Sequence, residues 1–380
     1  MKREKKLFKY QLIHDALAAK IAAGLLEKLP SEEELGKEFS AGRNIVRQAL
    51  QMLSDEGYII KEQGRHARIC RKKFADPVRE AKLVLLQRHD YQGANDNPVY
   101  AGIVSKLLEI AAGRGCLIEL LYLPAPGNTQ YARFVAEKLR TADGIFMTVL
   151  RLNEPQKEIA EILSAHPRTI CVDNAVGSFG RYHVGTDNYS GGWLAAETLY
   201  NAGRTKPLIY GCGNAFSEYS PMIERAMGFR DGCCSLLGNF NRNEQFILNE
   251  VSPEFHIVSD SMKKLLDSGK IFDSIFVLSD HAAVYTVRAL RALGKKVPED
   301  VAVIGFDGIA ESGDFASLTS IRQNIESVAA ESFLIMEKLL RNEIVTGSIS
   351  PVPPSLKQGT TLFFPGEKKA VCDSSKSMVY

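Results

Sequence analysis

Residues 274–307 read SIFVLSDHAAVYTVRALRALGKKVPEDVAVIGFD, and this stretch decides the fold of the larger part of the chain. Two short apolar runs, at 274–278 and 301–306, have the length and composition of buried strands. Between them, residues 282–293 repeat apolar side chains at helical spacing. A strand, a helix and a second strand in this order favour a parallel sheet that is covered by helices.

The same alternation extends toward the N-terminus. Further buried strands are expected at 82–86, 117–121, 144–149, 169–172 and 207–210, and helices at 99–114, 130–140 and 191–202. This part of the chain is long enough for two doubly wound lobes with a cleft between them. We therefore expect an α/β two-lobed domain over residues 82–365.

The first 75 residues show a different pattern. Amphipathic helices are expected at 8–24, 31–39 and 43–56, and Ser31 with Glu34 has the spacing of a capping box at the start of the second. Two short strands, 58–61 and 66–70, follow and are joined by a turn at Gly64. Three helices and a basic hairpin predict an α+β winged helix-turn-helix domain.

The third of these helices has two unlike faces. Val46, Ala49, Leu50 and Leu53 form a buried stripe, whereas the opposite face carries Arg43, Asn44, Arg47 and Gln48. Such side chains bind phosphates and the edges of guanine and adenine in the major groove, although a solvated helix face would look similar. The adjacent hairpin with Gly64 and Arg65 at its tip favours DNA.

Charge is distributed unevenly between the two parts. Residues 1–75 hold 16 Lys or Arg and 10 Asp or Glu, whereas the remainder holds 31 and 35. A basic head on a slightly acidic body is consistent with a nucleic-acid partner for the head alone.

The head resembles the DNA-binding domain of the GntR family. The matching residues are Leu29-Pro30-Ser31-Glu32, Arg43, Val46-Arg47, Ala49-Leu50, Leu53, Glu56-Gly57-Tyr58 and Gly64-Arg65. The resemblance implies that Arg43 and Arg47 contact double-stranded operator DNA and that the Gly64-Arg65 tip enters the minor groove. Two departures imply fewer phosphate contacts than usual, because Glu33 replaces an arginine and Gly42 replaces a serine or threonine.

The larger part resembles the LacI/GalR effector domain, which is similar to periplasmic sugar-binding proteins. The resemblance rests on residues 184–192, 224–230, 279–294 and 297–307, and on 318–323. It implies a small-molecule effector, most simply a sugar, that is held between the lobes. The residues that it assigns to the effector are Asp173, Arg225, Ser279, Asp280 and Asp307.

Signatures of other classes of protein are missing from the sequence. The patterns GxxxxGK[ST], GxSxG and HExxH do not occur, and the seven cysteines form no CxxC pair. No apolar run reaches the length of about 18 residues that a membrane helix needs, and the basic N-terminus lacks the apolar core of a signal peptide. We expect a cytoplasmic protein that is not an enzyme and has no membrane partner, metal or cofactor.

Together these features predict a chain organised as a DNA-binding domain (1–70), a linker (71–81), an effector-binding and dimerisation domain (82–365) and a flexible tail (366–380). The predicted function is that of a homodimeric transcription regulator, a repressor, whose operator affinity depends on the effector. The alternative is a soluble sugar-binding or sugar-converting protein whose N-terminal domain is an interaction module.

Overall fold

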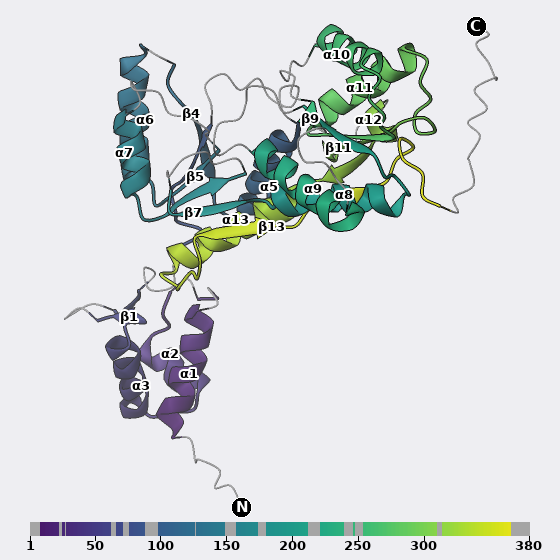
Figure 1. The fold of residues 1–380 in the computed structure, drawn as a ribbon. Helices are drawn as coiled ribbons and strands as arrows, with labels where there is room; N and C mark the ends of the chain where they lie inside the picture. Colours follow the sequence, from purple (N-terminus) through teal and green to yellow (C-terminus); the bar gives the residue numbers. More distant parts are fainter. Residues whose placement is uncertain are drawn as a thin grey trace, which may run out of the picture. The chain divides into compact units, whose positions relative to one another are not determined.

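The computed structural model describes residues 8–22, 25–26, 28–61, 66–70, 76–87, 98–125, 127–148, 157–173, 180–211, 221–238, 246–247, 254–309 and 314–365. The chain divides into two compact units, Met1–Glu80 and Ala81–Tyr380. Figure 1 shows the helical N-terminal unit in purple and the larger α/β unit in blue through teal and green to yellow. Among the described residues, no helix is long and apolar enough to cross a membrane.

The described residues of the N-terminal unit form three helices and a two-stranded antiparallel sheet. These elements are α1 (Lys9–Ala22), α2 (Glu32–Glu38), α3 (Arg43–Asp55), β1 (Ile59–Ile60) and β2 (Arg68–Ile69). The apolar stripes of all three helices meet in one core, to which Ile13, Leu35 and Leu53 each contribute a fully buried side chain. The predicted winged helix-turn-helix is confirmed, with strands shorter than the sequence indicated.

The first sheet of the larger unit has six strands in the order β13-β7-β6-β5-β3-β4 and is entirely parallel. Its strands are β3 (Leu83–Gln87), β4 (Ile118–Tyr122), β5 (Gly144–Met147), β6 (Thr169–Val172), β7 (Tyr182–Thr186) and β13 (Ile349–Val352). Helices α6 (Thr129–Thr141) and α7 (Lys157–Ala165) pack on one face. Helices α5 (Pro98–Gly113) and α13 (Ile325–Leu340) pack against each other, and α13 also contacts β6 and β7.

The second sheet also has six strands, in the order β14-β12-β11-β10-β8-β9. They are β8 (Pro207–Tyr210), β9 (Phe246–Ile247), β10 (Ser274–Val277), β11 (Ala302–Asp307), β12 (Thr319–Arg322) and β14 (Ser355–Lys357), which alone runs antiparallel to its neighbour. Side chains alternate along the central strand: Ile275 faces one core and Phe276 faces the other.

Helices cover both faces of this second sheet. One core includes side chains of α10 (Phe255–Asp267) and α11 (Asp280–Ala292), and the other includes those of α8 (Asn188–Asn201) and α9 (Pro221–Leu237). The short helix α12 (Asp314–Ser317) lies between β11 and β12 in the chain. The predicted pair of doubly wound parallel sheets is therefore confirmed.

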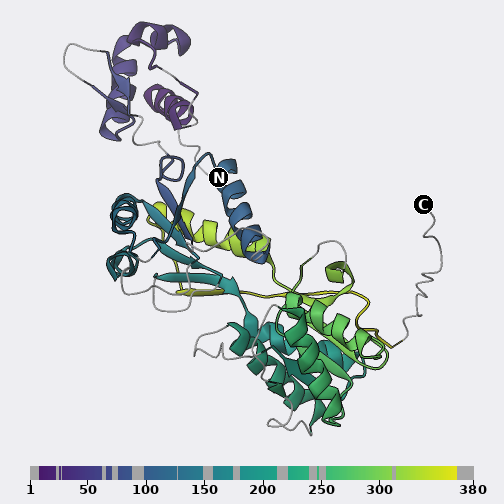
Figure 2. The same ribbon diagram turned by 90° about the horizontal axis from the view of Figure 1, so that it is seen from above.

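Three chain segments connect the two lobes, between β7 and α8, between β12 and α13, and between β13 and β14 (Figure 2). Hydrogen bonds join these segments to one another. The Thr186 hydroxyl donates to the Gln323 side chain at 2.7 Å, and the Asp187 N–H donates to the Val352 carbonyl at 2.8 Å. Because three short connections are joined in this way, they are the natural hinge for motion of one lobe against the other.

Candidate functional site

The exposed face of α3 is the first candidate site. The four predicted residues Arg43, Asn44, Arg47 and Gln48 are all exposed, while Val46 on the opposite face is fully buried. Arg43, Asn44 and Gln48 form no hydrogen bond or ion pair with the described residues. Their side chains are therefore available to a partner molecule.

The two departures from the GntR pattern have structural consequences. Gly42 is the N-cap of α3 and supplies no side-chain hydrogen bond to the helix, as its lack of a side chain requires. Glu33 forms an ion pair with Lys37 at 2.8 Å on the same helix. The carboxylate that would repel a DNA phosphate is thus partly neutralised by the lysine one turn later.

Arg47 contacts a carboxylate of the preceding helix. Its Nε donates to Glu32 Oε2 at 2.9 Å and to Oε1 at 3.2 Å. The sequence did not reveal this pair, because the two residues are 15 positions apart and meet only when α2 packs against α3.

The wing begins as predicted. Ile59 pairs with Ile69, Ile60 pairs with Arg68, and the Cys70 N–H donates to the Tyr58 carbonyl at 2.9 Å. The predicted tip residues Gly64 and Arg65 lie outside the described residues.

The second candidate site is a cavity of about 180 Å³ in the two-lobed domain. Parallel sheets bind ligands at the carboxyl ends of their strands, and this cavity follows that rule because Asp173 comes directly after β6 and Asp307 ends β11. The described residues that line it are Pro98, Val99, Asp173, Met222, Arg225, Ser279, His281, Asp307, Ile309 and Gln323. Four of the five effector residues assigned from sequence are among them.

Arg225 lines this cavity although it is only 5% exposed, and its hydrogen bonds hold its side chain in place. Its Nε donates to Asn188 Oδ1 at 2.9 Å, and its Nη1 donates to the Leu278 carbonyl at 2.7 Å and to Asp307 Oδ1 at 3.2 Å. The guanidinium also lies over the Phe306 ring, 3.7 Å from its centroid. A buried arginine with these partners is fixed in orientation, as a group that binds a ligand directionally needs to be.

Two aspartates from different lobes reach the cavity in unusual backbone conformations. Asp173 has φ 64° and Asp307 has φ 127°, values that L-residues rarely adopt. Burial raises the pKa of the Asp173 carboxyl, Arg225 and His183 oppose the rise and the Asp307 carboxylate adds to it, so that the pKa lies at about 6. Strained backbone and a raised carboxyl pKa in one cavity are features that concentrate at functional sites.

Asp280 lies behind the cavity rather than in its lining. Its side chain is fully buried; Oδ1 accepts from the Ser320 hydroxyl at 2.6 Å and Oδ2 from the Ile309 N–H at 2.8 Å. Ser320 in turn accepts from the Gly308 N–H at 3.0 Å, and Lys357 Nζ donates to the Ile309 carbonyl at 2.6 Å. Burial, with Asp307 nearby, raises the pKa of the Asp280 carboxyl. The contacts of Asp280 therefore fix the turn that carries Asp307 and Ile309.

Ser279 does line the cavity, and its hydroxyl makes no hydrogen bond with the described residues. Sequence reasoning missed Gln323, whose Nε2 donates to Asp307 Oδ1 at 2.9 Å, and Asn188, which holds Arg225. Gln323 directly follows β12 and Asn188 comes two residues after β7, but neither strand was predicted, so the strand pattern did not point to these two residues.

The described residues contain no cluster of three or more His, Cys, Asp or Glu side chains that could hold a metal ion. Residues 88–97, 149–156, 174–179, 212–220 and 310–313, which come after strands in the chain, lie outside the described residues. In the described residues, the first candidate site is a polar helix face and the second is a cavity lined by charged and amide side chains.

A winged helix-turn-helix head followed by a two-lobed domain with a polar cavity defines the class of regulators that combine a DNA-binding and an effector domain. Residues 9–69 match the bacterial regulatory proteins of the gntR family, and residues 196–362 match the periplasmic binding protein-like domain. The chain is accordingly a transcriptional regulator that combines a gntR-type DNA-binding domain with a periplasmic-binding-protein-like effector domain.

Similar proteins of known sequence are regulators and not enzymes. The HTH-type transcriptional regulator CelR of Thermobifida fusca is 24% identical over 322 residues, which are 82% of this chain and 86% of CelR. The ribose operon repressor of Lactococcus lactis is 26% identical over 194 residues, 49% of this chain and 54% of that protein. The sucrose operon repressor of Pediococcus pentosaceus is 30% identical over 179 residues, 43% of this chain and 49% of that protein.

Solved structures support the fold. A complex of CelR with cellobiose superposes with a TM-score of 0.59 at 19% identity and covers 88% of this chain and all of that one. A sugar-binding regulator of the LacI family from Escherichia coli, complexed with phosphate, gives 0.59 at 21% identity and covers 75% and 99%.

Proposed function

We propose that this regulator is a repressor whose operator affinity is controlled by a small neutral sugar bound in the cavity between the lobes. The observation that carries the proposal is the meeting, in one cavity, of Arg225 and Asp307 from the second lobe with Asp173 from the first. Planar cations and carboxylates in fixed orientations hold hydroxyl groups by charge-assisted hydrogen bonds.

The charge of the cavity favours a neutral ligand over an anionic one. Among its described residues, two aspartates outnumber the single arginine, and the arginine already contacts Asp307. A sugar phosphate would bring further negative charge beside both carboxylates, whereas the hydroxyls of a neutral sugar can donate to them. The names of the relatives, which mention cellobiose, ribose and sucrose, supply the first compounds to test.

The location of the cavity suggests how the effector acts on DNA binding. Asp173 and Asp307 lie on opposite lobes, and their like charges repel. A ligand that donates hydroxyls to both carboxylates would bridge the lobes and close them about the three connections of the hinge. Coupling of this kind changes the affinity for DNA by a factor that corresponds to about 1–3 kcal/mol.

The test begins with DNA selected by the full-length protein from a random 30-base-pair library. Affinity for the selected duplex is then measured by fluorescence anisotropy with cellobiose, ribose, sucrose and their phosphates. We expect one neutral sugar to raise the melting temperature and to weaken DNA binding by at least fivefold, and Ser279→Ala to reduce both effects. Unchanged DNA affinity in the presence of a sugar that raises the melting temperature would refute control by this site.

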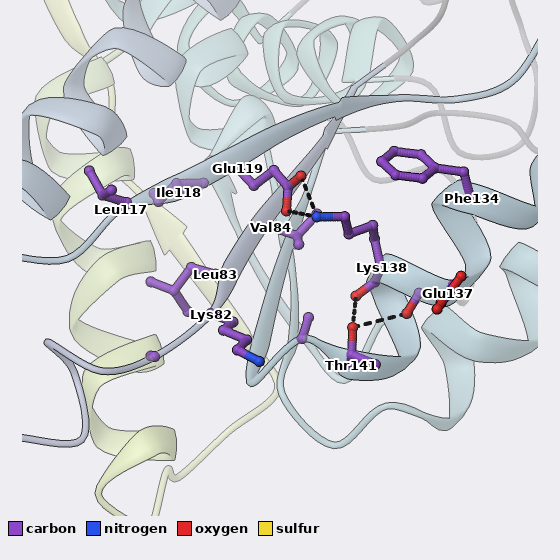
Figure 3. A pocket seen from close by; sticks show the side chains of 12 residues that line it. Lys82, Leu83, Val84, Leu117, Ile118, Glu119, Phe134, Glu137, Lys138 and Thr141 are labelled. Carbon is purple, nitrogen blue, oxygen red and sulfur yellow. Dashed lines mark hydrogen bonds and ion pairs between the residues drawn. The ribbon is translucent and has the colours of Figure 1, made fainter. Parts of the chain in front are cut away.

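We further propose that the active form is a homodimer that pairs through the outer face of β4. This strand ends the first sheet, and the described residues include no strand beyond it. Leu117, which is 83% exposed, and the exposed Phe134 line a groove of about 710 Å³ (Figure 3), and Leu120 and Tyr122 on β4 are also exposed. An exposed edge strand with apolar side chains is a template for pairing with another strand.

A second copy of the chain suits this face because a twofold axis brings the same strand to each side. The Glu119–Lys138 ion pair, at 2.8 Å, places both signs of charge beside the groove, so that two copies can meet without net repulsion. In sedimentation velocity, Leu117→Lys with Leu120→Lys should give monomers. The control Ile271→Lys, at a position of the second lobe that is 74% exposed, should remain dimeric; a dimeric double variant would exclude this face.

A further inference from the structure

The ion pair between Glu32 and Arg47 connects the first turn of α2 to the recognition helix. The Arg47 side chain is 59% exposed and that of Glu32 is 37% exposed. Exposed ion pairs stabilise a fold by at most about 1 kcal/mol, because water screens them and two long side chains must be ordered. Stability alone therefore gives little reason for this contact.

The geometry of the pair indicates a different role. Both hydrogen bonds to the carboxylate come from Arg47 Nε, and Nη1 and Nη2 form none with the described residues. The two Nη groups form the edge of a guanidinium that can donate to O6 and N7 of guanine at once. The carboxylate thus occupies one edge of the guanidinium and leaves the edge that reads a base free.

We propose that Glu32 is a specificity-determining positioning residue that orients Arg47 for guanine and away from the phosphate backbone. An unrestrained arginine on a DNA-facing helix can contact phosphates at many angles, which adds affinity but no sequence information. A carboxylate at Nε restricts the plane of the guanidinium and repels phosphates beside it. The inference rests on the proposed function, because it requires that α3 faces DNA.

Glu33 provides a matched control in the same turn of α2. It carries the same charge, lies in the same part of the helix dipole, and pairs with Lys37 rather than with α3. Removal of either carboxylate changes the net charge of the head equally. Only removal of Glu32 releases the guanidinium of Arg47.

The experiment compares full-length wild type with Glu32→Ala, Glu32→Gln, Glu33→Ala and Arg47→Ala. Each binds the duplex selected by wild type, a scrambled duplex, and single-base variants of the selected site. Circular dichroism confirms that each variant is folded. The quantities measured are the ratio of specific to non-specific affinity and the preference at each base position.

We expect Glu32→Ala to lower the specificity ratio about tenfold relative to Glu33→Ala, with the loss confined to the one guanine position that Arg47→Ala also abolishes. Glu32→Gln keeps an acceptor for Nε and should restore part of that preference. Both alanine variants of glutamate should bind the scrambled duplex more tightly, because each removes a negative charge, and Glu32→Ala should gain more because it also frees Arg47 to contact phosphates.

Equal specificity ratios for Glu32→Ala and Glu33→Ala would overturn the positioning role. A loss of preference spread evenly over all base positions would overturn it as well, since that pattern indicates a general disturbance of the head. If wild type selects no sequence from the library, the DNA-binding function itself fails, and the positioning role fails with it. A failure of wild type to select DNA is distinguished from the two outcomes with variants because it appears before any variant is tested.

Discussion

Replacement of Asp173 by asparagine should stabilise the effector domain at neutral pH. The carboxyl has an ordinary pKa of 3.8, and burial beside Asp307 raises it to about 6 in the folded protein. Each tenfold difference in proton affinity corresponds to about 1.4 kcal/mol, so the ionised carboxylate destabilises the folded state by at most about 3 kcal/mol. Asparagine is close in shape and tolerates φ 64°, so the substitution adds no backbone strain.

The dependence of this effect on pH follows from the direction of the shift. A raised carboxyl pKa means that the folded state binds the proton more tightly, so the destabilisation is absent below the unfolded pKa and complete above the folded one. The gain from Asp173→Asn should therefore rise from about 0.5 kcal/mol at pH 4 toward at most about 3 kcal/mol at pH 7.5. The Asp173 side chain is half-buried, so water screens part of its charge. We therefore expect the gain in stability at pH 7.5 to lie between one third of this upper value and all of it.

Urea denaturation at several pH values measures this gain. The chain has one tryptophan, Trp193 on α8, so its fluorescence reports on the effector domain, and coincidence with circular dichroism tests for a single transition. The exposed Asp260, replaced by asparagine, serves as a control and should change stability little at any pH. The reasoning is refuted if Asp173→Asn is less stable than wild type at pH 7.5, or if its gain is the same at pH 4 and pH 7.5.

Three further predictions concern the head and the packing of the second lobe. Glu33→Arg should strengthen binding to any duplex and increase the slope of log affinity against log salt by about 0.9, as one added phosphate contact requires; a salt titration measures it. Gly42→Ser should stabilise the head by a few tenths of a kcal/mol in calorimetry, because its φ of −68° suits an N-cap and nothing lies within 4 Å of an added Cβ. Gly192→Ala should destabilise the second lobe by more than about 3 kcal/mol in urea, since its Cβ would lie 1.9 Å from the Arg225 carbonyl oxygen on α9.

Local sequence patterns were sufficient to predict the main elements of the fold. The strand limits predicted at 169–172 and 207–210 agree with the structure, because each strand is a short apolar run in the middle of a parallel sheet. Five strands were not predicted: β7, β9, β12, β13 and β14. Strand β9 has only two residues, the others mix polar with apolar residues, and β9, β13 and β14 lie at sheet edges. Helix α8 begins three residues before the predicted start, where Asp187 accepts from the Ser190 N–H and caps it.

The candidate cavity was only partly predictable. Family motifs indicated Arg225 and Asp307, and the structure joins them by a hydrogen bond of 3.2 Å. Gln323 and Asn188 could not be inferred from local pattern, because their contacts depend on how the two lobes and their connections pack. The burial of Asp280, which the family resemblance assigned to the effector, could not be inferred for the same reason: its carboxylate accepts from the Ile309 N–H of a turn that lies 29 residues later in the chain.

The electrostatic strain at Asp173 is large enough to drive the proposed control. An effector that donates hydroxyls to this carboxylate replaces lost solvation, and so recovers part of the free energy, at most about 3 kcal/mol, by which the ionised carboxylate destabilises the folded state. This recovered free energy shifts the equilibrium between the open and closed arrangements of the lobes only to the extent that it differs between the two arrangements. Because Asp173 lies on the first lobe while Arg225 and Asp307 lie on the second, a ligand reaches all three only when the lobes approach, and most of the recovered energy then favours the closed arrangement. That amount is similar to the coupling of about 1–3 kcal/mol that allosteric regulators use. Asp173→Asn should therefore uncouple DNA affinity from the effector even where it makes the domain more stable.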